Sequence, residues 1–188
     1  MYQEKDYNSL LGLAGFSDNL LQTHFKLYQG YVKNTNTLLE NFKTAEVGTP
    51  QYAEMKRRFG WEFDGMRLHE LYFDNLIKDA AGVVGATSIK KAIERDFGSF
   101  ARWQKDFEAV ATLRGIGWAI LYYDQDAKKL FNVWINEHDA GHLVGAKPLL
   151  VCDVFEHAFV LDYGMARADY LKSFFKAINW PVVAQRLS

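Results

Sequence analysis

The sequence predicts an α+β protein: an N-terminal antiparallel helical hairpin, then an α/β lobe with a three-stranded antiparallel sheet flanked by helices. Two observations carry this prediction. Apolar side chains recur with helical spacing over most of residues 17–78, interrupted at "GTP" (48–50). Further on, aromatic and β-branched residues fill two short runs separated by the turn-forming "DQDAKK" (124–129). We expect a helical-hairpin domain at 1–82 and an α/β domain at 83–188.

The hairpin is expected to consist of two long helices. Ser17 can cap the first helix, which continues to Phe42. Pro50 can open the second, which runs to about Ile77 with a kink near Gly60. The inward faces carry apolar and aromatic residues together with two histidines: Leu20, His24, Leu27, Tyr28 and Tyr31 on the first helix, and His69, Tyr72 and Phe73 on the second.

The second half mixes helices and strands. Residues 79–88 contain two glycines and indicate a linker, and Gly98 separates two short amphipathic helices. From residue 155 to 180 the pattern is helical, with a break near Gly164. The expected strands are 118–123, 130–135 and 148–154.

Composition excludes several classes of function. The net charge is -1 and the charges are scattered, which argues against binding to nucleic acid or to a membrane surface. No apolar run approaches the roughly 20 residues of a membrane span, and the first ten residues lack the pattern of a signal peptide. Cys152 is the only cysteine and is expected to be a buried thiol, so we expect a cytoplasmic protein.

Four of the chain's ionisable residues are expected to meet in the core. His24 and His69 lie on the inward faces of the hairpin, and Asp153 and His157 lie where the third strand passes into a helix. A single histidine in such surroundings is more often a core residue than a ligand. Buried ionisable groups are costly unless they pair or bind metal, so the set of four favours a site for iron, manganese or zinc.

Several segments resemble one family. Residues 153–180, "DVFEHAFVLDYGMARADYLKSFFKAINW", are similar to the C-terminal signature of the iron/manganese superoxide dismutases. The family's Gly-x-Gly-Trp strand resembles "GIGWAILYYD" (115–124), and its two histidine segments resemble "HFKLYQGYVKNTN" (24–36) and "LHELYF" (68–73). The resemblance implies an oxidoreductase that converts superoxide to oxygen and hydrogen peroxide.

The family's metal ligands match four positions here. The resemblance makes His24 the axial ligand and His69, Asp153 and His157 the equatorial ligands of one iron or manganese ion per subunit, with a solvent molecule at the fifth position. The site would lie between the two domains. The short segment between His138 and Asp153 is similar to the iron-type form, so iron is slightly preferred.

The resemblance also implies an outer sphere around the metal. Tyr31 matches a tyrosine that donates a proton near the solvent ligand. Relatives place an amide either four residues before the second ligand, here Gly65, or after the second strand, where this chain has His138. We expect His138 to be the outer-sphere donor, with His142 as its rival. Three aromatic residues would line the site: Trp118, Phe155 and Tyr72.

Glu156 matches a glutamate that reaches the partner's metal-binding histidine, which implies a homodimer, with a tetramer as the alternative. Two features depart from the family. Its gateway histidine corresponds to Leu27 or Tyr28, and its paired tyrosine to Val160. These departures motivate an alternative function: a metal-binding relative with weak or no dismutase activity, acting in redox or metal sensing. A zinc hydrolase and a metal-free structural module are the other readings, and no HExxH motif supports the hydrolase.

Overall fold

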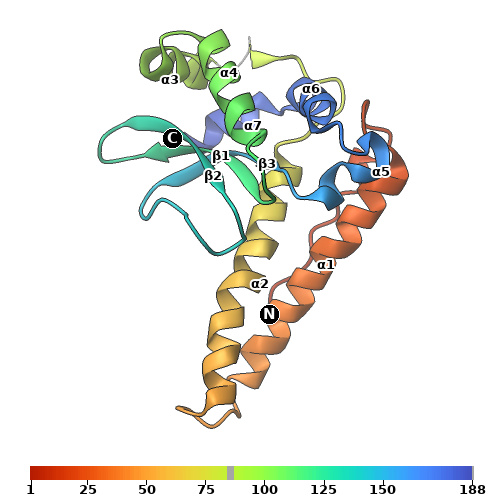
Figure 1. Ribbon diagram of the computed structural model, residues 1–188, viewed down its shortest axis with the longest axis vertical. Coiled ribbons are helices and arrows are strands. Elements are labelled where there is room, and N and C mark those ends of the chain that lie inside the picture. The colour runs from red at the N-terminus through yellow and green to blue at the C-terminus, as the bar shows by residue number, and fades with distance from the viewer. Residues whose placement is uncertain (84–86, 188) are drawn as a thin grey trace.

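The computed structural model describes residues 1–83 and 87–187. It has the predicted α+β architecture, with two long helical arms joined to a lobe built around a small sheet (Figure 1). The elements in chain order are a 3₁₀ turn at Asn8–Leu10, α1 (Asp18–Asn41), α2 (Pro50–Asp74), α3 (Thr87–Phe97), α4 (Phe100–Ala111), β1 (Trp118–Asp124), β2 (Lys129–Ile135), β3 (Lys147–Asp153), a 3₁₀ turn at Glu156–Ala158, α5 (Val160–Tyr163), α6 (Arg167–Ala177) and α7 (Trp180–Arg186).

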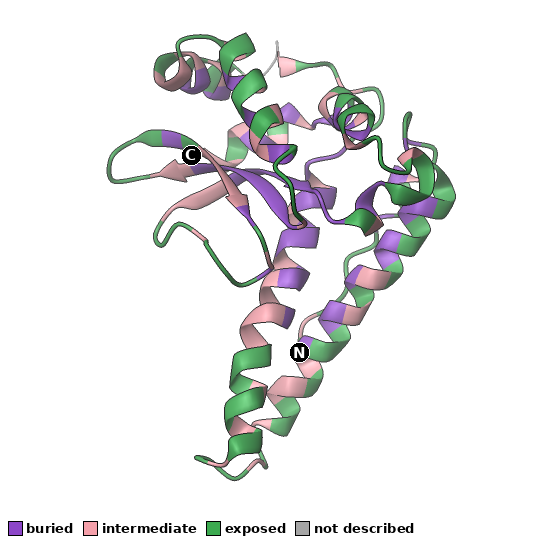
Figure 2. Cartoon of the chain, viewed as in Figure 1, coloured by how far each residue is buried: buried purple, intermediate pink, exposed green. Residues whose placement is uncertain are grey.

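The hairpin forms as predicted, with α1 and α2 antiparallel and joined at an exposed tip (Figure 2). The hydroxyl of Ser17 accepts a hydrogen bond from the backbone N–H of Leu20, at 3.1 Å. Thr49 caps α2 in the same way, and Pro50 occupies its first turn. The helix is continuous through Gly60, and the kink expected near that residue stays a prediction. Buried residues concentrate where the arms approach the lobe.

The sheet has the order β2-β1-β3, with both pairs antiparallel. The central strand β1 is almost fully buried, in keeping with its run of apolar and aromatic residues. Its first residue, Trp118, pairs with Ile135 of β2 and with Asp153 of β3. This register brings the start of β1 and the ends of β2 and β3 to the edge of the sheet that faces the hairpin.

Hydrogen bonds tie the end of the hairpin to the lobe. The side-chain amide of Asn75 donates to the carbonyl of Val151 in β3, at 2.7 Å. The backbone N–H of Ile77 donates to the carbonyl of Ala177 at the end of α6, at 2.9 Å. α4 packs against β1 and β2, and α7 packs against β3. The domain boundary at residue 82 stays a prediction.

The C-terminal segment differs from its prediction. Instead of a helix from Phe155 with one break, the chain forms the 3₁₀ turn followed by three separate helices. Gly164 ends α5 with a φ of 53°, a left-handed conformation that favours glycine, as the break near this residue predicted. Ile178 is extended and ends α6, and α7 beyond it was not predicted.

The predicted linker at 79–88 overlaps the start of α3 at Thr87, and its residues 84–86 lie outside the described residues. Within residues 1–83 and 87–187, no helix combines the length and apolarity that crossing a membrane requires.

Candidate metal centre

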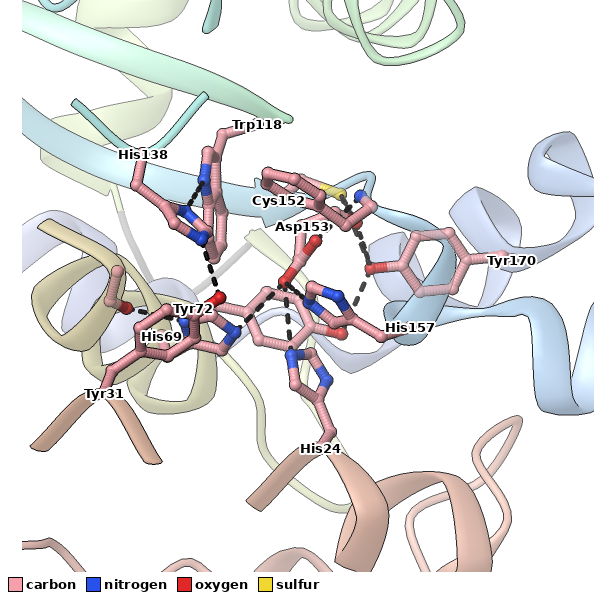
Figure 3. A network of polar contacts seen from close by, with 12 residues as sticks. His24, Tyr31, His69, Tyr72, Trp118, His138, Cys152, Asp153, His157 and Tyr170 are labelled. Carbon is pink, nitrogen blue, oxygen red and sulfur yellow. Dashed lines mark hydrogen bonds and ion pairs between the residues drawn. The ribbon is translucent and has the colours of Figure 1, made fainter. Parts of the chain in front are cut away.

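The four predicted ligands meet in one buried cluster (Figure 3). His24 comes from α1, His69 from α2, Asp153 from the last residue of β3, and His157 from the 3₁₀ turn that follows. One potential ligand atom from each side chain lies within 4.8 Å of every other. A turn rather than the expected helix carries His157, and its side chain alone of the four is partly exposed, at 25%.

The Asp153 carboxylate is the centre of this cluster. Its Oδ2 atom lies 3.2 Å from His24 Nε2, 3.0 Å from His157 Nε2 and 3.6 Å from His69 Nε2. Its Oδ1 atom accepts a hydrogen bond from the backbone N–H of Phe155, at 2.9 Å. One carboxylate oxygen is thus fixed by the backbone, and the other faces three imidazoles.

The donor atoms fit a metal ion of the iron or manganese kind. His69 Nδ1 lies 2.6 Å from the carbonyl oxygen of Gly65, which can only accept, so Nδ1 carries the proton. Nε2 of His69 therefore presents a lone pair to the cluster, and this buried atom has no hydrogen-bond partner. Such an unsatisfied buried atom needs an explanation, and a bound cation provides one. Three imidazole nitrogens and one carboxylate suit iron and manganese.

The protonation states agree with this interpretation. Burial lowers the pKa of His24 and lowers that of His69 well below the ordinary value, which keeps both imidazoles neutral at pH 7. Burial alone would raise the pKa of Asp153, but the charge and hydrogen bonding of His157 and His24 outweigh it and hold that pKa well below its usual range. The site therefore offers an ionised carboxylate at Asp153 and neutral imidazoles at His24 and His69, the states that metal binding requires.

His138 lies beside the cluster with both ring nitrogens engaged. Trp118 Nε1–H can only donate, and it donates to His138 Nδ1 at 3.1 Å. Burial lowers the pKa of His138 to about 4, so the ring is neutral at pH 7 and its single proton is on Nε2. That proton is donated to the Tyr31 hydroxyl, at 2.8 Å. The hydrogen of Tyr31 thus remains available to another acceptor.

Position 65 cannot supply the outer-sphere group with Tyr31 where it lies. A Cβ atom added to Gly65 would be 2.7 Å and 2.8 Å from two carbons of the Tyr31 ring, distances that real Cβ contacts do not show. His138 and His142, the two histidines expected to compete for the outer-sphere role, differ in their contacts. His142 bonds to the backbone carbonyl of His138 and to Tyr122, and does not join the cluster.

Aromatic rings surround the cluster. The Trp118 ring meets His69 edge-on, with centroids 5.0 Å apart, and Phe155 stacks on His157 at 5.2 Å. The ring of Trp61 packs on His138 with centroids 4.6 Å apart. No local pattern singles out Trp61, because its contact with His138 depends on how the segment after β2 folds back onto α2.

Tyr72 lies beside His24. Its ring centroid is 5.3 Å from that of His24, and its hydroxyl is 3.1 Å from the hydroxyl of Tyr170. Tyr170 in turn donates to the backbone carbonyl of Asp153, at 2.8 Å. Tyr170 therefore holds the backbone of a predicted ligand, a role that the residue pattern did not indicate.

The positions that depart from the family carry no polar relay. Leu27 and Val160 are apolar, and Val160 is partly exposed. Tyr28 is fully buried, but its hydroxyl binds Glu70 Oε1 and the backbone N–H of Lys5 instead of the cluster. Glu156 is exposed beside His157.

Comparisons with known proteins agree with this geometry. Residues 85–186 match the family model described as "Iron/manganese superoxide dismutases, C-terminal domain". "Superoxide dismutase [Mn] 2" of Haloferax volcanii is 37% identical over 90% of this chain and 86% of its own length. "Superoxide dismutase [Fe]" of Cupriavidus metallidurans is 37% identical, covering 94% and 90%, and that of Aquifex aeolicus is 35% identical, covering 98% and 90%. The chain belongs to the iron/manganese superoxide dismutase family.

Proposed function

We propose that this protein disproportionates superoxide at a single iron or manganese ion held by His24, His69, Asp153 and His157. The observation that carries the proposal is the convergence of three imidazole Nε2 atoms on one carboxylate oxygen, with His69 Nε2 buried and unpartnered. Relatives named as iron and as manganese superoxide dismutases support the choice of metals. Two superoxide ions and two protons give one oxygen and one hydrogen peroxide.

A bound iron or manganese ion would supply one-electron chemistry, accepting an electron from one superoxide and returning it to a second. The side chains around it govern protons and access. Burial raises the pKa of Tyr31 above its ordinary value, so its hydroxyl stays protonated and can donate to an oxygen in the pocket. The N–H of His138 orients that hydroxyl, and Trp118 fixes the proton on His138. Trp118 and Phe155 keep the pocket apolar apart from these donors.

Iron is our preferred metal, with manganese as the alternative, and the two can be separated directly. Protein stripped of metal is reloaded with either ion, and metal content and the rate of superoxide loss are measured on the same samples. We expect one ion per chain and activity with at least one metal. Full occupancy without dismutation would instead support the alternative of a metal-binding relative in sensing, which the apolar Leu27 and Val160 motivate.

Ligand variants test the site itself. Substituting His69 or Asp153 by alanine should abolish both metal content and activity, because each removes a donor atom from the cluster. Matched replacement of Tyr123, on β1 but outside the cluster, should leave both unchanged. Unchanged metal content in both ligand variants would contradict the proposed site.

We further propose a homodimer formed through the surface beside His157. Exposed Glu156 adjoins the ligand, and Leu161 and Met165 nearby are 54% and 90% exposed, an apolar surface that association would cover. Glu156 would then reach the partner's His157. Light scattering after size-exclusion chromatography distinguishes dimer, tetramer and monomer, and Leu161→Glu should shift a dimer toward monomer. A cytoplasmic location is proposed from the single buried thiol and is tested by cell fractionation.

A further inference from the structure

A second set of hydrogen bonds holds the backbone of His138. The Nε2 atom of His142 is 2.6 Å from the carbonyl oxygen of His138, and its Nδ1 atom is 2.6 Å from the hydroxyl of Tyr122. Tyr122 belongs to the central strand β1, whereas both histidines lie on the segment between β2 and β3. The contacts therefore fasten this segment to the central strand of the sheet.

The direction of each hydrogen bond follows from the atoms involved. The His138 carbonyl can only accept, so His142 Nε2 carries a proton and donates it. Burial, with a contribution from the nearby Asp64 carboxylate, raises the pKa of Tyr122 above its ordinary value. Tyr122 thus remains a phenol, and its O–H can donate to His142 Nδ1 when that atom carries no proton. The chain of donors runs from Tyr122 through His142 to the backbone of His138.

His138 is consequently held at both ends. Its ring is fixed by Trp118 and Tyr31, and its backbone by His142. The segment also rests on α2, where Trp61 donates to Glu137 at 3.0 Å. The ring and backbone contacts together set how closely the His138 N–H approaches the hydroxyl that faces the metal pocket.

We propose that His142, held by Tyr122, is a positioning residue that clamps the backbone of His138 and thereby sets the hydrogen bond from His138 to Tyr31. This inference rests on the proposed function, because its consequence is the tuning of the metal site. His142 itself touches neither the substrate nor the ligands. From the sequence, His138 and His142 were expected to compete for one role, and the hydrogen bond between them was not anticipated.

The test uses four variants of the full-length protein. His142→Leu removes the clamp while keeping an apolar side chain of moderate size, and His142→Gln keeps a donor near the position of Nε2. Tyr122→Phe removes only the hydroxyl that fixes His142. Tyr123→Phe is the matched control, because Tyr123 is the next residue of β1 and its side chain points to the other face of the sheet.

The first measurement is ¹⁵N NMR of histidine-labelled, metal-free protein, which reports the His138 tautomer and the exchange of its Nε2 proton. We expect exchange to accelerate about fivefold in His142→Leu, the effect of one lost hydrogen bond, and less in Tyr122→Phe. His142→Gln and Tyr123→Phe should match the wild type. Wild-type exchange in both His142→Leu and Tyr122→Phe would overturn the proposal, and Tyr122→Phe decides alone if His142→Leu does not fold.

The second measurement is the reduction midpoint potential of the metal-loaded protein. It should shift in His142→Leu and return to the wild-type value in His142→Gln. An unshifted potential in His142→Leu would also overturn the proposal, because positioning without an effect on the metal has no functional consequence. Failure of the proposed function would be distinguishable: wild-type protein would lack dismutase activity, while the NMR result on metal-free protein would be unaffected.

Discussion

Replacing Gly65 by alanine tests the packing on which the outer sphere depends. The added Cβ would lie 2.7 Å from the Tyr31 ring, so the ring must move by roughly 1 Å to reach an ordinary contact. Overpacking of this kind costs about 3 kcal/mol at the upper end of its range. Alanine in a helix interior regains about 1 kcal/mol over glycine. The net expectation is a loss of about 2 kcal/mol in the free energy of unfolding.

Gly30 on α1 provides the matched control. A Cβ at Gly30 meets nothing within 4 Å, so Gly30→Ala should stabilise the protein by about 1 kcal/mol. The two variants should then differ by about 3 kcal/mol, or roughly 6–12 °C in melting temperature for a chain of this size. Thermal unfolding followed by circular dichroism measures this difference.

The same substitution should affect activity. Displacing Tyr31 breaks its 2.8 Å contact with His138, so Gly65→Ala should lose dismutase activity by roughly tenfold, while Gly30→Ala keeps it. If Gly65→Ala proved as stable and as active as Gly30→Ala, Tyr31 would not pack against position 65, and the reasoning that assigns the outer-sphere role to His138 would fail.

Three further predictions concern charge, pH and metal. Asp153→Asn keeps the shape but removes the anionic ligand, and chelator competition should show metal affinity reduced by about 100-fold or more. The pKa of His138 falls from an ordinary 6.5 to about 4 on folding, so the unfolded chain binds more protons between these values. The contribution of His138 to the free energy of unfolding of the metal-free protein should be fully present above pH 6.5 and should be lost, by about 3 kcal/mol, as the pH falls toward 4. Denaturant titrations at several pH values should therefore find a flatter loss of stability in His138→Gln than in the wild type. An equal loss in both proteins would contradict the lowered pKa of His138. Metal at 1,000 times its dissociation constant should stabilise the chain by about 4 kcal/mol, measured by calorimetry before and after chelation.

Much of this structure follows from local patterns. Ser17 and Pro50 mark helix starts that the structure confirms, and the DQDAKK turn correctly locates the β1–β2 hairpin. The four residues of the cluster were found because their chemistry is costly in a core. These signals are local in sequence or intrinsic to the residue type, so they do not require knowledge of the tertiary structure.

Other features depend on contacts between distant segments. His157 lies on a 3₁₀ turn that places its Nε2 atom 3.0 Å from Asp153 Oδ2, and helical periodicity did not reveal this turn. The Tyr122–His142 contact joins a strand to a loop 20 residues away, and neither residue has a distinctive neighbour in sequence. Such pairs become visible only once the register of the sheet and the path of the following loop are known.

The pairing of Trp118 with Asp153 has a consequence for how the protein matures. Sliding β3 by one residue against β1 would turn the side chain of Asp153 away from the hairpin and so away from the three imidazoles. His24 and Asp153 are also separated by 129 positions. Without this strand pairing the chain offers only incomplete sets of ligands, His24 with His69 on the hairpin or Asp153 with His157. The complete set of four ligands therefore exists only once β3 has paired in the correct register, so full metal affinity depends on tertiary folding.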